Sequence, residues 1–290
     1  MKNMKLIKII LLLFILSKAG QAFATAQIHD LLIIGKDTFA LCNNPLDVYI
    51  EQKGSDVIGK HELKVTSTAL WRGYVATWEL KNDSLFLVHL QDNWGDDSNE
   101  ISISDEFGSD RVFAHWVTDM LRCPQGEMIQ YVHRGYESIY EGDKFYAIEQ
   151  GRLKGTTSLN YLEKDDNRLF PGEYFLIKYL QKRIIKSIDA TERDSLNEDV
   201  LSRILKVRFN KEGKISYIGY QSREDEPTTR DINEEIILRN AQEALRGLPQ
   251  LMKVNHKWYQ PPVLELYFSK HCLKHPEDKE YGCDEEQYSL

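Results

Sequence analysis

A break followed by an amphipathic run near the midpoint constrains this sequence more than any other feature. Pro171 and Gly172 interrupt the preceding segment, and Glu173 stands where a helix N-terminus favours negative charge. The apolar side chains that follow recur at the spacing of one helix face. They are Leu176, Leu180, Ile184 and Ile188, with Ile177 and Ile185 beside them. The pattern predicts a new helix here, and with it a domain boundary.

The rest of the second half alternates between strand and helix patterns. Residues 203–222 predict a hairpin whose turn ends at Gly213. Residues 231–249 predict a helix, capped by Asp231 with Glu234 and ended by Gly247 and Pro249. Its predicted packing stripe is Ile237, Ala241, Ala244, Leu245 and Leu248. After two prolines, residues 263–269 predict a third strand, which makes the order helix, strand, strand, helix, strand.

This order, with its local motifs, resembles the C-terminal domain of the TonB family, in the version found in exported and envelope proteins of Bacteroidetes-type bacteria. The matching segments lie within residues 169–269 and are FPGEYFLIKYLQKRI, ILKVRFNKEGKISYIGYQS, NEEIILRNAQEALRGLPQL and KWYQPPVLELYFS. The resemblance implies two helices packed on a three-stranded antiparallel sheet. It also implies that a short extended peptide of an outer-membrane receptor binds by strand addition beside the last strand.

An edge strand suits that role because its unpaired N–H and C=O groups accept a partner strand. The partner-binding residues implied by the resemblance are Val263, Leu264, Glu265, Leu266, Tyr267, Phe268 and Ser269. Lys206 and Arg208 on the hairpin are their expected charged neighbours. The expected partner is a peptide or strand of another envelope protein.

Residues 27–160 predict an antiparallel β-rich domain, so the expected fold class is α+β. Turn residues suggest hairpins around 35–37, 81–83 and 141–143, and residues 92–110 form an acidic loop. Residues 111–121 also fit a single helix. The remaining predicted segments are a linker at 161–168, the second domain at 169–270 and a tail at 271–290.

Two segments of the first half are similar to each other, namely 71–79 and 133–141, since each contains Arg-Gly-Tyr followed by an aromatic residue and Glu. A functional interpretation makes these segments the walls of a ligand site. Its contacts would be Tyr74, Trp78, Arg134 and Tyr136. The alternative, cross-strand aromatic packing with glycine at a bulge or close approach, is favoured because glycine in a strand more often marks backbone geometry.

The first residues predict export. Residues 1–26 contain lysines, a short apolar run and A-x-A sequences, which are typical of a cleaved signal peptide, and the run is shorter than the roughly 20 residues that span a bilayer. We therefore expect a periplasmic or secreted protein without a stable membrane span after processing; a retained anchor is the alternative. Processing would change the formal net charge of −8 to about −12, which disfavours nucleic-acid binding.

Export also affects the interpretation of the four cysteines. Cys42, Cys123, Cys272 and Cys283 would lie in an oxidising compartment, where an even number suggests disulfides. Three connectivities are open, and pairing Cys272 with Cys283 and Cys42 with Cys123 keeps each bridge local. The spacing of cysteine and histidine gives no metal site, and no cofactor fingerprint or catalytic motif occurs.

These features predict a non-enzymatic, exported interaction protein of the envelope that uses its second domain for recognition. One alternative is a secreted ligand-binding protein or hydrolase that acts through the aromatic-rich first half. The other is a TonB-type energy transducer, which would require the N-terminus to remain attached to the membrane.

Overall fold

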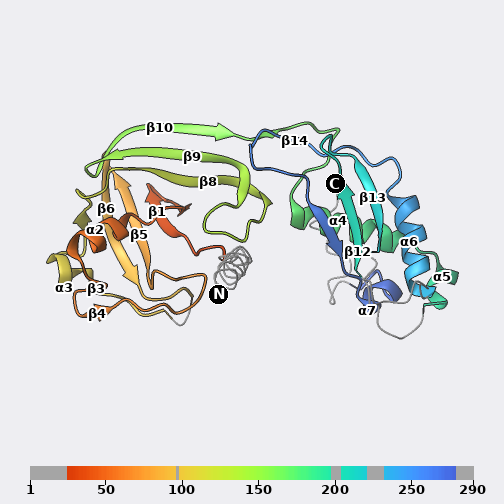
Figure 1. The fold of residues 1–290 in the computed structure, drawn as a ribbon, viewed down its shortest axis with the longest axis horizontal. Coiled ribbons are helices and arrows are strands. Elements are labelled where there is room, and N and C mark those ends of the chain that lie inside the picture. The colour runs from red at the N-terminus through yellow and green to blue at the C-terminus, as the bar shows by residue number, and fades with distance from the viewer. Residues whose placement is uncertain (1–24, 96–97, 197–203, 221–231, 279–290) are drawn as a thin grey trace, which may run out of the picture. The chain divides into compact units, whose positions relative to one another are not determined.

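The computed structural model of the chain describes residues 25–95, 98–196, 204–220 and 232–278. The predicted signal segment, residues 1–26, lies outside this part apart from its last two residues. The fold is a mixture of α and β structure with a large sheet-rich body and a few helices (Figure 1). The chain divides into two compact units. Unit 1 comprises residues 1–123, 132–138 and 145–157, and unit 2 comprises residues 124–131, 139–144 and 158–290.

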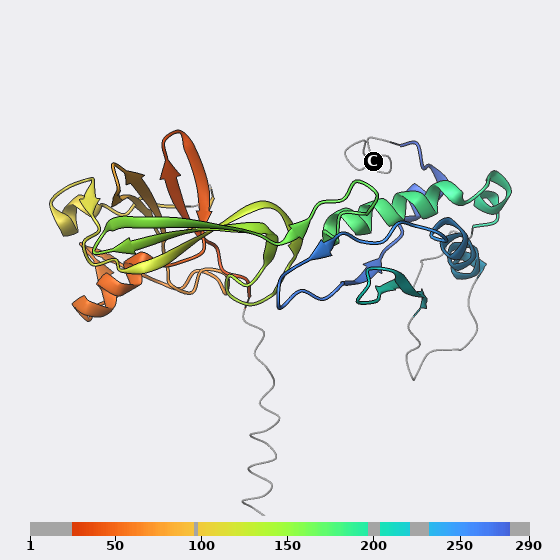
Figure 2. The same ribbon diagram turned by 90° about the horizontal axis from the view of Figure 1, so that it is seen from above.

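An eight-stranded sheet forms most of the β structure among the described residues. Its strands are β1 (Asp30–Ile34), β2 (Asp37–Leu41), β5 (Val75–Lys81), β6 (Ser84–Gln91), β7 (Val112–Phe113), β8 (Asp119–Gln130), β9 (Ile139–Glu149) and β10 (Arg152–Asn160). Seven of them follow the order β2-β1-β5-β6-β10-β9-β8, and β7 pairs with β6. Figure 2 shows β8, β9 and β10 running side by side. Smaller elements of the first half are α2 (Pro45–Lys53), β3 (Val57–Ile58), β4 (His61–Glu62) and α3 (Ile103–Phe107).

Two of the predicted hairpins are confirmed. β1 pairs antiparallel with β2 around residues 35–36, and β5 pairs antiparallel with β6 around residues 82–83. Asn82 and Asp83 have φ angles of 49° and 52°. Positive φ at both central residues is the mark of a type I′ turn, whose twist matches that of the two strands.

The third predicted turn is wrong. Residues 141–143 lie inside β9, and the chain reverses instead at Gln150 and Gly151, which both have positive φ. Gly142 is required for a different reason: a Cβ at this position would collide with the carbonyl oxygen of Leu159. The predicted helix at 111–121 is also wrong, because this segment contains β7 and the start of β8.

Unit 2 contains a three-stranded antiparallel sheet of order β13-β12-β15. Its elements are β11 (Leu162–Glu163), α4 (Glu173–Ser187), α5 (Ala190–Asp194), β12 (Leu205–Phe209), β13 (Ile215–Tyr220), α6 (Ile232–Ala244), β14 (Lys253–Val254), β15 (Val263–Leu266) and α7 (Lys270–Lys274). Helix α4 contacts β15, α6 contacts β13, and the two helices contact each other, so both cover one face of the sheet (Figure 1).

Helix α4 begins at the predicted residue, Glu173, directly after Gly172. The four residues of its predicted face are at most 2 % exposed, and they join the sheet in one apolar core. Burial of this face stabilises unit 2, because each fully buried aliphatic side chain contributes about 1.5–3 kcal/mol. The helix predicted at 231–249 forms as α6, and its proposed cap Asp231 lies outside the described residues.

The boundary between the units differs from the predicted linker at 161–168. That segment contains β11, which pairs with β14. Unit 2 also includes residues 124–131 and 139–144 from the first half. Ile129 and Ile139 from these pieces form a small core with Leu162. In β8 the change of unit coincides with Pro124 and Gly126, which interrupt the strand pattern, and Gly126 has a positive φ of 73°.

Candidate functional site

β15 lies at one edge of the three-stranded sheet. It pairs antiparallel with β12 on one side, and no described strand pairs with its other side. Glu265 stands opposite Lys206, and the Nζ to Oε1 distance is 2.9 Å. The hydrogen bond from Lys206 holds the pKa of Glu265 below its usual range. A cross-strand ion pair therefore marks the solvent face of this edge, as expected from the alternation of strand side chains.

The two faces of β15 differ in burial. Leu264 and Leu266 are fully buried in the core of unit 2, whereas Val263 is 49 % exposed and Tyr267, directly after the strand, is 60 % exposed. The buried pair anchors the strand on α4, so the strand is held in place independently of any partner. An edge fixed in this way is preorganised for pairing, because a partner would not need to order it.

The strand is shorter than predicted. It ends at Leu266, and the carbonyl of Tyr267 accepts a hydrogen bond from Gln181 of α4. Phe268 lies outside the strand, and Ser269 is the N-cap of α7. Of the seven predicted partner-binding residues, the strand thus includes Val263, Leu264, Glu265 and Leu266. The strand ends where a residue distant in sequence intervenes, because Gln181 of α4 binds the carbonyl of Tyr267.

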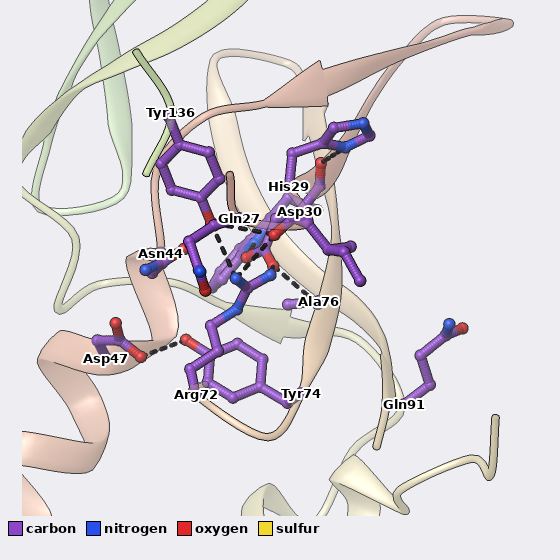
Figure 3. Close-up of polar contacts among 12 residues, drawn as sticks. Gln27, His29, Asp30, Asn44, Asp47, Arg72, Tyr74, Ala76, Gln91 and Tyr136 are labelled. Atoms are coloured by element: carbon purple, nitrogen blue, oxygen red, sulfur yellow. Dashed lines mark hydrogen bonds and ion pairs between the residues drawn. The ribbon is translucent and has the colours of Figure 1, made fainter. Parts of the chain in front are cut away.

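A buried polar cluster in unit 1 centres on Asp30 (Figure 3). Asp30 is fully buried and accepts hydrogen bonds from Arg72 Nη2 at 2.8 Å, from the Ala76 amide at 3.0 Å and from Trp78 Nε1 at 3.0 Å. Burial raises the pKa of Asp30 to about 6, and the Arg72 guanidinium and these donors oppose that rise. The Asp30 charge raises the pKa of Arg72 against the effect of its own burial. The pair satisfies the rule that buried charges are partnered.

Arg72 also joins the two Arg-Gly-Tyr segments. Its Nη1 donates to the Tyr136 hydroxyl and to the Ile28 carbonyl, both at 2.8 Å. The Tyr136 hydroxyl in turn donates to Asn44 Oδ1 at 2.7 Å. Burial is the main cause of the raised pKa of Tyr136. These contacts connect four separated stretches of the chain, so the cluster acts as an internal brace.

The four predicted ligand contacts do not form a ligand site. Tyr74 and Trp78 are fully buried, and the Tyr74 hydroxyl donates to Asp47 (Figure 3). Arg134 is exposed and forms an ion pair with Glu137 at 2.6 Å. Core side chains without solvent contact are not available to a ligand. The close backbone approach of the alternative is present at Gly73, beside Lys64, but the two segments do not pack as neighbouring strands, because β5 pairs with β1 and β6 and residues 133–138 lie outside the strands. Sequence reasoning missed Asp30, because an isolated aspartate at a strand start carries no motif.

The described cysteines differ in whether they form a disulfide. Cys272 of α7 is disulfide-bonded, and its predicted partner Cys283 lies outside the described residues. Cys42 and Cys123 are thiols in this structure, which differs from the predicted bridge. Their segments nevertheless meet, since the Cys42 amide donates to the Arg122 carbonyl at 2.8 Å. β2 and β8 stand at the two ends of the strand order, and this hydrogen bond joins the chain directly after β2 to β8.

The described residues give two further findings. No group of three or more histidine, cysteine, aspartate or glutamate side chains lies close enough to hold a metal ion in this part of the chain. No helix among the described residues is long and apolar enough to cross a membrane. Neither finding identifies a function.

No protein-family model, curated protein or solved structure matches this chain. The candidate site is therefore interpreted from its own geometry. The edge of β15 presents backbone groups on an anchored strand, whereas the Asp30 cluster is enclosed. Of these two features, only the edge is placed to contact another molecule.

Proposed function

We propose that this chain is an exported, envelope-associated protein that binds an extended peptide or strand of another envelope protein beside β15. The observation that carries the proposal is the position of β15, which has β12 on one side and no described strand on the other. A partner strand would add backbone hydrogen bonds worth about 0.5–1.5 kcal/mol each. This role requires no catalytic residue, metal or cofactor.

The same proposal treats residues 169–269 as a module similar to the TonB C-terminal domain. Its support is the order α4, β12, β13, α6, β15 and the packing of both helices on one face of the sheet. A TonB-like module would place its peptide along the last strand, which is β15 here. The order of the elements thus identifies β15 as the recognition strand, and the backbone N–H and C=O groups of β15 would pair with the peptide.

The faces of β15 predict the pattern of the partner. Because Leu264 and Leu266 face the core and Glu265 faces solvent, an added strand would continue both faces. Its side chains would be apolar beside the buried pair and polar beside Glu265. We therefore expect an extended segment with alternating apolar and polar residues.

Export is part of the proposal because the partner lies in the envelope. The support is the sequence of residues 1–26. N-terminal sequencing of the protein recovered from cells tests it: a new terminus near Thr25 or Gln27 supports export with cleavage. An intact Met1 terminus would favour the alternative of an anchored transducer.

The binding proposal is tested with peptides selected from a random library on the whole protein. Hydrogen exchange of the complex should show slower exchange at Val263–Leu266 and no change in β13, the opposite edge of the sheet. The double variant Val263→Lys/Tyr267→Lys alters two exposed side chains and leaves the buried leucines in place. We expect it to weaken binding at least about tenfold, because charge on an edge opposes strand addition.

Tyr217→Lys is the matched control, since Tyr217 is exposed on β13 at the opposite edge. It should leave the affinity unchanged. If the selected peptides protect another segment, or if the β15 and β13 variants bind equally well, strand addition at β15 is excluded.

A further inference from the structure

A pocket of about 690 Å³ lies in unit 2 between the end of β8 and the first turns of α4. This volume is within the range of roughly 300–1,000 Å³ that is usual for small-molecule sites. The fully buried Ile129 lies at its wall and belongs to a core cluster, so the pocket is formed on a packed base. It shares no residue with β15 and is independent of the proposed peptide site.

The pocket combines aromatic rings with two acidic side chains. The rings are Tyr131, Phe170, Tyr174 and Phe175, and the acids are Glu127 and Glu173. Tyr131 is 49 % exposed and Tyr174 is 62 % exposed, so their rings are accessible to a ligand. Among the described residues that line the pocket there is no lysine or arginine. The lining is therefore apolar with negative charge.

The apolar part of the wall is held in place by local packing. The rings of Phe170 and Phe175 make an edge-to-face contact with centroids 5.8 Å apart, and Phe175 stacks on Tyr179 at the same distance. Gly172 lies against the Phe170 ring, where a Cβ would collide with it. These contacts fix the segment that carries Glu173 into the pocket.

The two carboxylates have no partner in the described part of the chain. The side chain of neither Glu127 nor Glu173 forms a hydrogen bond or an ion pair with another described residue. Desolvation by burial raises the pKa of Glu173, and no charged side chain among the described residues opposes that rise. An acidic group that is partly desolvated without a counter-ion is stabilised by a cation that enters the site.

The aromatic rings favour the same kind of ligand, because the face of an aromatic ring attracts cations within about 6 Å. Tyr174 already shows this behaviour, since the Lys178 ammonium lies 5.8 Å from its ring centroid. We propose that this pocket binds a small organic cation, an ammonium group on an apolar body. The ammonium would lie near Glu127 and Glu173, and the apolar body would contact the rings.

Calorimetric titration of the whole protein tests the proposal with three probes of similar size: hexyltrimethylammonium, hexanol and hexanoate. The cation should bind saturably and at least about tenfold more tightly than the alcohol. The anion should bind more weakly than both. Exchange of the two carboxylates, Glu127→Gln/Glu173→Gln, should lower the affinity for the cation about tenfold and leave that for hexanol unchanged.

Binding of hexanol by the double variant shows that the pocket is intact, so a loss of cation binding is not a loss of folding. Glu235→Gln is the matched control, because Glu235 is an exposed carboxylate in the first turn of α6. The proposal is overturned if the three probes bind alike, if the cation does not saturate, or if the double variant keeps its affinity. Self-association of the protein that the double variant abolishes would identify a second copy as the occupant, and would also overturn it.

Discussion

Arg72 Nη1 donates a 2.8 Å hydrogen bond to the hydroxyl of Tyr136, which joins the two Arg-Gly-Tyr segments across 64 positions of sequence. The same guanidinium neutralises Asp30 in the core of unit 1. One side chain thus holds β1, the loop before β5 and the segment after β8 together. The role of Arg72 is structural, so its replacement should lower the free energy of unfolding.

Replacement of Arg72 by methionine should destabilise the protein by about 3–5 kcal/mol at pH 7, because the Asp30 carboxylate would be left buried without a counter-ion. The loss should be smaller at pH 5, where Asp30 is able to bind a proton. Urea unfolding followed by circular dichroism measures both values. Arg134→Met is the matched control at the equivalent position of the second segment; it is exposed, so the unfolding midpoint should not change. Equal effects of the two variants would show that Arg72 does not stabilise unit 1 through these contacts.

The stability of unit 1 should depend on the protonation of Asp30. Its pKa is about 6 in the folded chain and 3.8 in the reference state, so the folded state binds the proton more tightly. The resulting stabilisation is fully present below pH 4 and is lost as the pH rises through 6, by up to about 3 kcal/mol. The difference in free energy of unfolding between wild type and Asp30→Asn should therefore fall from pH 4 to pH 7. A carboxyl carbon resonance of Asp30 that titrates near pH 4 would contradict this.

Alanine should be tolerated differently at the two equivalent glycines. Gly73 and Gly135 have φ angles of 74° and 51°, so alanine costs about 1 kcal/mol or more at either position. At Gly73 the added Cβ would also lie 2.6 Å from the Lys64 carbonyl oxygen, whereas at Gly135 it would meet nothing within 4 Å. Gly73→Ala should thus lower the melting temperature clearly more than Gly135→Ala. Similar melting temperatures for the two variants would show that the segment 64–73 rearranges.

One change in the β5–β6 turn should stabilise the protein. Asp83 adopts a φ of 52°, which glycine accepts without strain. Asp83→Gly creates the Asn-Gly pair preferred in type I′ turns. Relief of the left-handed conformation should exceed the entropy cost of glycine and add about 0.5–1 kcal/mol to the free energy of unfolding. Thermal unfolding measures the gain, and Lys36→Gly in the β1–β2 turn serves as a comparison without positive φ at that residue. A loss of stability in Asp83→Gly would show that the Asp83 side chain is needed.

Patterns of local origin could be predicted from the sequence. Helix α4 has an uninterrupted fourfold apolar spacing, and the Gly213 turn needs a positive φ, which the structure gives as 73°. Both depend on residues close in the chain, so no knowledge of the tertiary structure is required. By contrast, α2 has no clear apolar stripe, and only Pro45 and Leu46 of this helix are buried. Tertiary contacts rather than local pattern determine such an element.

Gly142 is a second case in which a contact distant in sequence determines the structure. Its position between Glu141 and Asp143 predicts a turn. The structure uses it for close approach to the Leu159 backbone, a contact made with a residue 17 positions later. The edge position of β15 was expected from a resemblance, and its end at Leu266 depends on Gln181 of α4. Contacts of this kind are not contained in any short stretch of sequence.

The interleaving of the two units affects how the chain is made and how it is cut. Residues 124–131 and 139–144 leave the ribosome before the last strand of unit 1, yet they complete a core with Leu162 of unit 2. Neither unit is complete until the other has been partly synthesised. A gene truncated at codon 160 would encode Ile129 and Ile139 without Leu162, and a protease that nicks the chain there would divide the same core between two pieces.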